Sequence, residues 1–151
     1  MGVHGMYYSC MNDSVAAKSS RHLDAILETA HALEARLEAT LDEAGLSGAK
    51  FSVLSELVRF GEALPLGELA SRLACVRSNM TQLIDRLEAD GLVHRVADPS
   101  DRRSIKAQIT EEGQRRQADG AKRVDALEQD LEALVSQADG AALHRMLMAL
   151  R

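Results

Sequence analysis

The chain contains no tryptophan, and its only aromatic side chains are those of Tyr7, Tyr8, Phe51 and Phe60. Alanine and the aliphatic residues supply most of the apolar composition instead. A β-sandwich would need more Val, Thr, Tyr and Trp, because these residues fit a pleated, half-buried surface. The composition therefore favours a mainly helical protein, and 151 residues are enough for one domain with a substantial core.

Long apolar runs and disulfide-forming cysteines are also missing. No apolar run approaches the roughly 20 residues needed to cross a bilayer. The first ten residues lack both the cationic start and the apolar stretch of a signal peptide. With only Cys10 and Cys75, no disulfide framework is expected, and a reducing compartment is the default. We therefore expect a cytoplasmic protein with no membrane partner.

Signatures of catalysis and metal binding are absent as well. The sequence has no Ser-His-Asp order, no glycine-rich phosphate loop and no Cys-x-x-Cys pair. Its five histidines are scattered, and His22 and His31 fall on opposite sides of a helix. The chain is therefore not expected to be an enzyme, nor to hold a cofactor or a metal ion.

Acidic residues outnumber basic ones, and the net charge of −5 at first argues against a nucleic-acid partner. The distribution weakens that argument, because the net charge is −4 over residues 1–64, +1 over 65–110 and −2 over 111–151. Local fields govern docking to DNA, while global charge mainly affects solubility and non-specific binding. An acidic body with one modestly basic segment indicates a specific binder with weak affinity for random DNA.

Hydrophobic periodicity divides the chain into four regions. Residues 1–18 have no periodicity and predict a flexible N-terminal arm. Apolar residues at three- and four-residue steps predict supporting helices over 19–64. Residues 65–110 predict two short helices followed by a β-hairpin, and 111–151 predict further helices. The expected fold class is mainly α, a winged helix-turn-helix with about six helices and a small β-hairpin wing.

Local end signals fix several of these elements. Gly91 predicts the end of the second short helix of residues 65–110, which is the fourth helix of the chain. Thr110 predicts the N-cap of a long fifth helix after the hairpin. Ser136, with Asp139 three residues later, predicts the beginning of the last helix. The first predicted helix and the last two predicted helices carry apolar stripes that a winged helix does not need for its own core. Packing these stripes across a two-fold axis would give a homodimer, and packing them within one chain is the alternative.

The fourth predicted helix has one apolar and one polar face. Met80, Leu83, Ile84 and Leu87 recur at helical spacing and predict its buried side. The opposite and flanking positions are Arg77, Ser78, Asn79, Thr81, Gln82, Asp85 and Arg86. Short polar donors and acceptors of this kind suit base edges and phosphates, whereas a face selected only for solubility would hold more Glu and Lys. Asp85 does not fit phosphate contact, so we expect it to face away or to orient a neighbouring arginine.

The expected tip of the hairpin, Asp98 to Arg103, carries two adjacent arginines, Arg102 and Arg103. A narrow minor groove concentrates negative potential and attracts an inserted arginine. Asp101 could hold Arg103 in an extended pose for that purpose, although a plain surface ion pair would leave the same pattern. A helix-turn-helix followed by such a wing is typical of a reader of double-stranded DNA.

The run DRLEADGLVHRVADPSDRRSIKAQITEEG resembles the multiple-antibiotic-resistance regulator (MarR) family of bacterial transcription factors. The likeness is close over residues 66–113, and its specific part is the Asp-x-x-Asp-Arg-Arg wing followed by a strand and Thr-x-x-Gly. It implies a homodimer with interlocked terminal helices, whose two winged helices meet successive major grooves of a pseudo-palindromic operator. It also implies repression that is released by a small-molecule effector, often an anionic one, or by thiol oxidation.

The resemblance assigns roles to individual residues. Asp101 and Arg103 would form the wing pair, and Arg86 would brace the wing or touch phosphate. The residues that would line the recognition helix are Arg77, Ser78, Asn79, Thr81 and Gln82. An effector pocket is expected where the first, second and fifth helices meet the reader.

Three further hypotheses follow for the remaining residues. His31, Phe51 and Leu54 are the candidate lining of the effector pocket. Cys75 is a candidate redox sensor just before the recognition helix, although a buried, inert thiol is the simpler interpretation. The alternative function from another class is a dimeric winged helix that contacts proteins and does not bind DNA.

Overall fold

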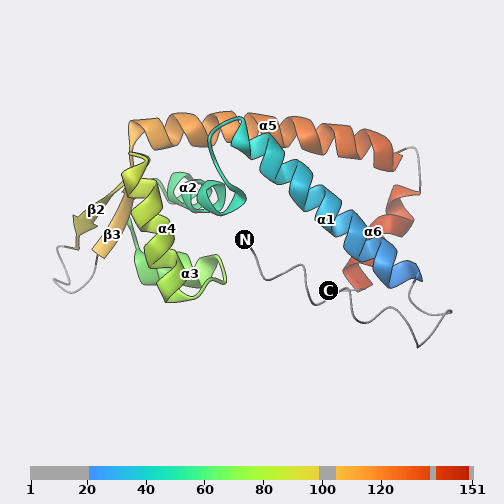
Figure 1. Ribbon diagram of the computed structural model, residues 1–151, viewed down its shortest axis with the longest axis horizontal. Helices are drawn as coiled ribbons and strands as arrows, with labels where there is room; N and C mark the ends of the chain where they lie inside the picture. Colours follow the sequence, from blue (N-terminus) through green and yellow to red (C-terminus); the bar gives the residue numbers. More distant parts are fainter. Residues whose placement is uncertain (1–20, 99–104, 137–138, 150–151) are drawn as a thin grey trace, which may run out of the picture. The chain divides into compact units, whose positions relative to one another are not determined.

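The structure is a computed structural model, and it describes residues 21–98, 105–136 and 139–149. The chain divides into two parts, residues 1–35 and 36–151. The helices of the described residues are α1 (Arg21–Asp42), α2 (Gly48–Phe60), α3 (Leu66–Arg72), α4 (Arg77–Ala89), α5 (Glu111–Ser136) and α6 (Gly140–Ala149) (Figure 1). The strands are β1 (Leu64–Pro65), β2 (Val93–Ala97) and β3 (Ile105–Ile109). No helix in these ranges is both long and apolar enough to span a membrane.

The predicted apolar stripes form helices whose apolar side chains remain largely exposed. Leu23, Leu27 and Leu33 are exposed on the part of α1 that lies in residues 21–35. On α6, Met146 and Leu147 are exposed in the same way. The helical periodicity of both segments is therefore confirmed, and the core of the chain lies elsewhere.

That core is built by α2, α3, α4 and the sheet, together with the end of α1. Leu41, Leu54 and Leu57 are fully buried in it. Helix α2 begins at an N-cap serine, Ser47, whose Oγ accepts a hydrogen bond from the N–H of Lys50. It ends at Gly61, whose φ of 69° is the left-handed conformation that glycine adopts without a steric cost.

Helices α3 and α4 form the predicted helix-turn-helix (Figure 1). The turn between them passes through Ala74, whose φ of 47° is positive although it is not a glycine. Leu69 of α3 packs into the same core as Met80 and Ile84 of α4, and all three are fully buried. The predicted apolar side of α4 therefore faces the core.

The hairpin belongs to a three-stranded antiparallel sheet with the order β1-β3-β2. Val93 pairs with Ile109 and Ala97 with Ile105, which confirms the predicted hairpin. Strand β1 was not predicted, because it has only two residues and one of them is Pro65. Proline has no backbone N–H to donate. It is tolerated in β1 because this strand lies at the edge of the sheet and has a partner strand on one side only.

Thr110 and Gly113 join the sheet to α5. The Thr110 Oγ accepts a hydrogen bond from the Gly113 N–H at 3.0 Å and donates one to the Gly91 carbonyl at 2.8 Å. A Cβ on Gly113 would lie 2.1 Å from the Leu92 carbonyl oxygen. The Thr-x-x-Gly motif therefore combines the predicted N-cap with a close backbone approach.

The predicted beginning of the last helix was wrong. Ser136 is the last residue of α5, and its Oγ donates to the Glu132 carbonyl at 2.7 Å. The cap of α6 is Asp139, whose Oδ1 accepts from the Ala142 N–H at 2.9 Å. Both residue types cap helices, but a serine hydroxyl can also donate a hydrogen bond to the carbonyl four residues earlier. Ser136 makes this second kind of hydrogen bond.

Candidate nucleic-acid interface

Helix α4 presents its predicted polar face to solvent. Met80, Ile84 and Leu87 are fully buried, so the opposite side of the helix points away from the core. The predicted face residues are all exposed: Arg77, Ser78, Asn79, Thr81, Gln82, Asp85 and Arg86. Burial of the apolar row thus fixes the direction in which the polar row projects.

The N-terminal end of this helix is electrostatically open to an anion. Its N-cap is Val76, and no side chain caps the first backbone N–H groups. No acidic residue lies in the first turn, where Arg77 is the first helical residue. Free N–H groups and the positive end of the helix dipole favour a phosphate at such a position.

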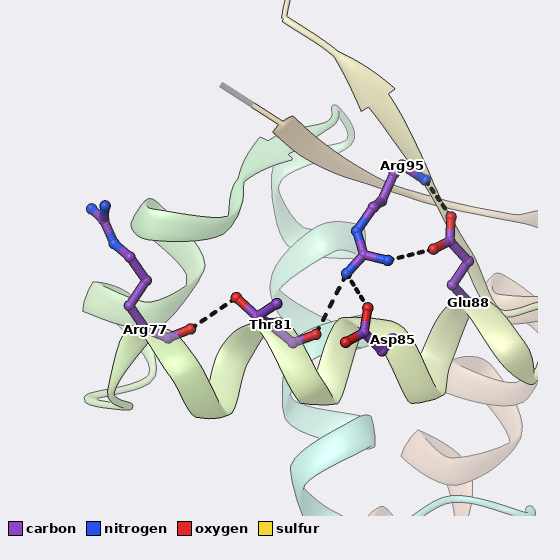
Figure 2. Close-up of polar contacts among 5 residues, drawn as sticks. All are labelled: Arg77, Thr81, Asp85, Glu88 and Arg95. Carbon is purple, nitrogen blue, oxygen red and sulfur yellow. Dashed lines mark hydrogen bonds and ion pairs between the residues drawn. The ribbon is translucent and has the colours of Figure 1, made fainter. Parts of the chain in front are cut away.

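Arg77 and Thr81 differ in how far they are engaged within the chain. The Thr81 hydroxyl donates to the Arg77 carbonyl at 3.1 Å, so its proton is already used (Figure 2). The Arg77 guanidinium lies against α3, where a Cβ on Gly67 would be 2.9 Å from Nη2. The glycine leaves room for the arginine, which makes no hydrogen bond through its side chain to the other described residues.

The C-terminal half of α4 is held by an arginine of the sheet. Arg95 of β2 donates from Nη2 to Asp85 at 2.5 Å and from Nη1 to Glu88 at 2.5 Å (Figure 2). The Arg95 backbone N–H also donates to Glu88 at 3.0 Å, and Nη2 lies 3.5 Å from the Thr81 carbonyl oxygen. These contacts tie α4 to β2.

This arrangement explains Asp85. The hydrogen bond to Asp85 is the main cause that raises the pKa of Arg95 above its ordinary value, and Glu88 adds to it against partial desolvation. Asp85 therefore orients an arginine, which was one of the two roles expected for it from the sequence. The arginine was missed, because its sequence neighbours in β2 give no sign of a partner ten residues earlier.

Arg86 does not brace the hairpin within the described residues. It is exposed, and its side chain makes no hydrogen bond or ion pair to another described residue. Among the described residues, Arg95 is the arginine that joins α4 to β2 by ion pairs. Contact of Arg86 with the wing or with phosphate stays a prediction.

The predicted wing residues Asp101, Arg102 and Arg103 lie outside the described residues. The strands on either side of them are described, with Asp98 following β2. The Asp98 carboxylate forms an ion pair with Lys106 of β3 at 3.2 Å. The roles assigned to the wing residues therefore remain predictions.

Cys75 lies in the turn of the helix-turn-helix. Its thiol is free and half-buried, it packs against the core, and its Sγ lies 3.5 Å from the Val76 carbonyl oxygen. Redox sensing by Cys75 stays a prediction. The described residues also contain no group of three or more His, Cys, Asp or Glu side chains that could hold a metal ion.

The three candidate pocket residues differ in burial, and their role in an effector pocket stays a prediction. His31 is exposed on α1, Phe51 is half-buried on α2, and Leu54 is fully buried in the core. A cavity of about 290 Å³ lies between the end of α2, β3 and the first turns of α5. Its lining residues are Leu57, Val58, Gly61, Glu62, Gln108, Ile109, Gln114, Gln117 and Ala118.

Together, the fold and the exposed face of α4 define a winged helix-turn-helix. Residues 46–105 match the model of the MarR family. The winged helix of this chain thus matches the MarR family model, which confirms the resemblance seen in the sequence.

Two comparisons with curated proteins agree. The chain is 33% identical over 98 residues to the HTH-type transcriptional regulator YsmB of Bacillus subtilis (strain 168), covering 65% of this chain and 62% of YsmB. It is 38% identical over 69 residues to the regulator MhqR of the same organism, covering 46% of this chain and 47% of MhqR. The chain thus spans less than two thirds of the length of these relatives.

Solved structures extend the likeness beyond the winged helix. Sco3205, a MarR family transcriptional regulator of Streptomyces coelicolor solved in complex with DNA, is 26% identical with a TM-score of 0.73, over 92% of this chain and 91% of that one. CouR bound to a 23-mer DNA duplex is 27% identical with a TM-score of 0.74, over 89% and 99%. CouR of Rhodococcus jostii RHA1 has also been solved with p-coumaroyl-CoA, with 27% identity and a TM-score of 0.68 over 89% and 93%.

Proposed function

We propose that this protein is a sequence-specific, double-stranded DNA-binding transcriptional regulator that represses as a homodimer. The observation that carries the proposal is the N-terminal half of α4, which is exposed, polar and uncapped above a fully buried apolar row. Phosphate neutralisation would supply most of the affinity, and the polar face would supply base readout. The relatives are named as transcriptional regulators and not as enzymes, and two solved relatives hold DNA.

The homodimer is supported by apolar rows that the chain leaves uncovered. Leu23 on α1, Leu134 on α5 and Leu147 on α6 are 59%, 59% and 52% exposed. Exposed apolar rows of this kind are usually covered by a partner surface. A two-fold dimer would place its two readers at half-sites about 34 Å apart, which matches a pseudo-palindromic operator.

The cavity beside β3 is the candidate effector site. Its lining supplies one carboxylate, from Glu62, and three amides, from Gln108, Gln114 and Gln117, but no cationic side chain. Without a cation, an anionic ligand would be desolvated there beside the like charge of Glu62. A small neutral or cationic effector therefore suits this cavity better than the anionic class that the family resemblance implies. It would act only through unequal affinity for the DNA-bound and free arrangements.

The test is fluorescence anisotropy of the purified protein on the DNA upstream of its own gene, over a salt series and with a scrambled duplex as control. Tight binding that is selective and falls steeply with salt supports the regulator, because phosphate contacts release counterions. Absence of binding to either duplex at low salt, by a well-folded dimer, would support the protein-contact alternative. Adding neutral, cationic and anionic aromatic compounds to the preformed complex then tests the effector class.

A further inference from the structure

An apolar side chain occupies the tip of the recognition helix. Val76 is the N-cap of α4 and is 62% exposed. N-caps are usually Ser, Thr, Asp or Asn, because an oxygen there can accept a hydrogen bond from the first turn. Valine offers no such oxygen and, at this exposure, little packing. Stability therefore does not explain the residue.

The turn before α4 directs Val76 outward. Ala74 adopts a left-handed φ of 47°, and the Cys75 N–H then donates to the Ala70 carbonyl at 2.9 Å. Cys75 packs against the core, so the side chain of the next residue, Val76, projects away from the core. Arg77, Ser78 and Asn79, which follow Val76, are exposed as well.

The major groove offers one apolar group that a valine can recognise. The C5-methyl group of thymine projects into that groove, and apolar side chains discriminate T·A pairs by contact with it. We propose that Val76 reads the methyl group of one thymine in each operator half-site and is a specificity-determining residue. This inference rests on the proposed function, because it requires the N-terminal end of α4 to enter the major groove.

The experiment replaces thymine with uracil, which lacks only the C5-methyl group. A high-affinity duplex is selected from a random pool with the full-length protein, and each thymine of one half-site is replaced in turn. At one position the Kd of the wild-type protein should rise about fourfold, the value expected for loss of one buried methyl group. Val76→Ala should bind the two duplexes equally at that position, whereas Val76→Ile, which remains branched and apolar, should keep the preference.

The outcomes separate the two proposals. If no duplex is enriched by the folded protein, the proposed function fails, and the inference fails with it. If a duplex is bound but no uracil weakens binding, only the inference is overturned. Retention of the thymine preference by Val76→Ala, with thermal unfolding unchanged, would likewise assign the preference to another side chain.

Discussion

The two halves of α4 carry different kinds of polar residue. Near its N-terminus, Arg77 and Asn79 are exposed and the helix has no side-chain cap. In its C-terminal half, Asp85 and Glu88 are held by Arg95 from the sheet. One helix thus keeps its first turns available for a ligand and uses its last turns to fix its position against the hairpin.

The polar side chains of the two halves also differ in what they contribute to stability and to binding. Exposed ion pairs such as Arg95–Asp85 contribute at most about 1 kcal/mol each, because water and salt screen them. Their effect is on orientation, since the same guanidinium contacts two carboxylates and a carbonyl of one helix. The exposed side chains of the N-terminal half contribute little to folding, so their substitution should change binding alone.

The largest expected effect comes from the buried side that supports both halves. Ile84→Ala removes a fully buried side chain of the core and should lower the free energy of unfolding by about 2–5 kcal/mol. Urea denaturation measures the loss. A change below about 1 kcal/mol would contradict the central place of α4 in the core.

The N-terminal half should respond in binding and not in stability. Arg77→Ala should weaken DNA binding by about 1–3 kcal/mol, with the unfolding midpoint unchanged. Arg59→Ala on α2 is the matched control, because it also removes an exposed arginine. Equal losses from the two variants would mean that net charge, and not position, determines the effect.

The C-terminal half should respond in both properties, and weakly. Arg95→Met leaves Asp85 and Glu88 as unpaired carboxylates, so stability and DNA affinity should each fall by less than about 1 kcal/mol. Lys106→Met removes a charge from the neighbouring strand without touching α4. If this control lowers affinity as much as Arg95→Met, the brace has no role of its own.

The smallest effect should come from an ion-pair cluster outside α4. Hydrogen bonding from Arg116 lowers the pKa of Glu112 below its ordinary value of 4.5, with Arg115 contributing. A lowered pKa stabilises the fold above about pH 4.5, and this contribution is lost as the pH falls through the folded-state value. Glu112→Gln should therefore reduce the acid sensitivity of thermal unfolding slightly and leave DNA affinity unchanged. An affinity change would connect this cluster to the reader.

Local patterns predicted the part of the site that depends on one helix. The row from Met80 to Leu87 sets which side of α4 is buried, and burial leaves its polar residues exposed. The cap at Thr110 was predicted for the same reason, since its oxygen acts three residues away. These features require only the helical period and the chemistry of a single cap.

Features that depend on distant segments could not be predicted in this way. Arg95 meets Asp85 only after the chain reverses through Gly91, and β1 forms only because β3 lies beside it. The cavity beside β3 forms where α2, β3 and α5 converge, and such a convergence leaves no periodic signal in the sequence. The choice between Ser136 and Asp139 depended on which oxygen the local backbone leaves free.

The central claim is that the N-terminal half of α4 reads DNA sequence. The most direct test measures binding of the wild-type protein and of a variant with Ser78, Asn79 and Gln82 replaced by alanine to a selected and a scrambled duplex. The account predicts that the variant folds normally and keeps the salt dependence of binding, but loses its preference for the selected duplex. An unchanged preference in the folded variant would contradict it.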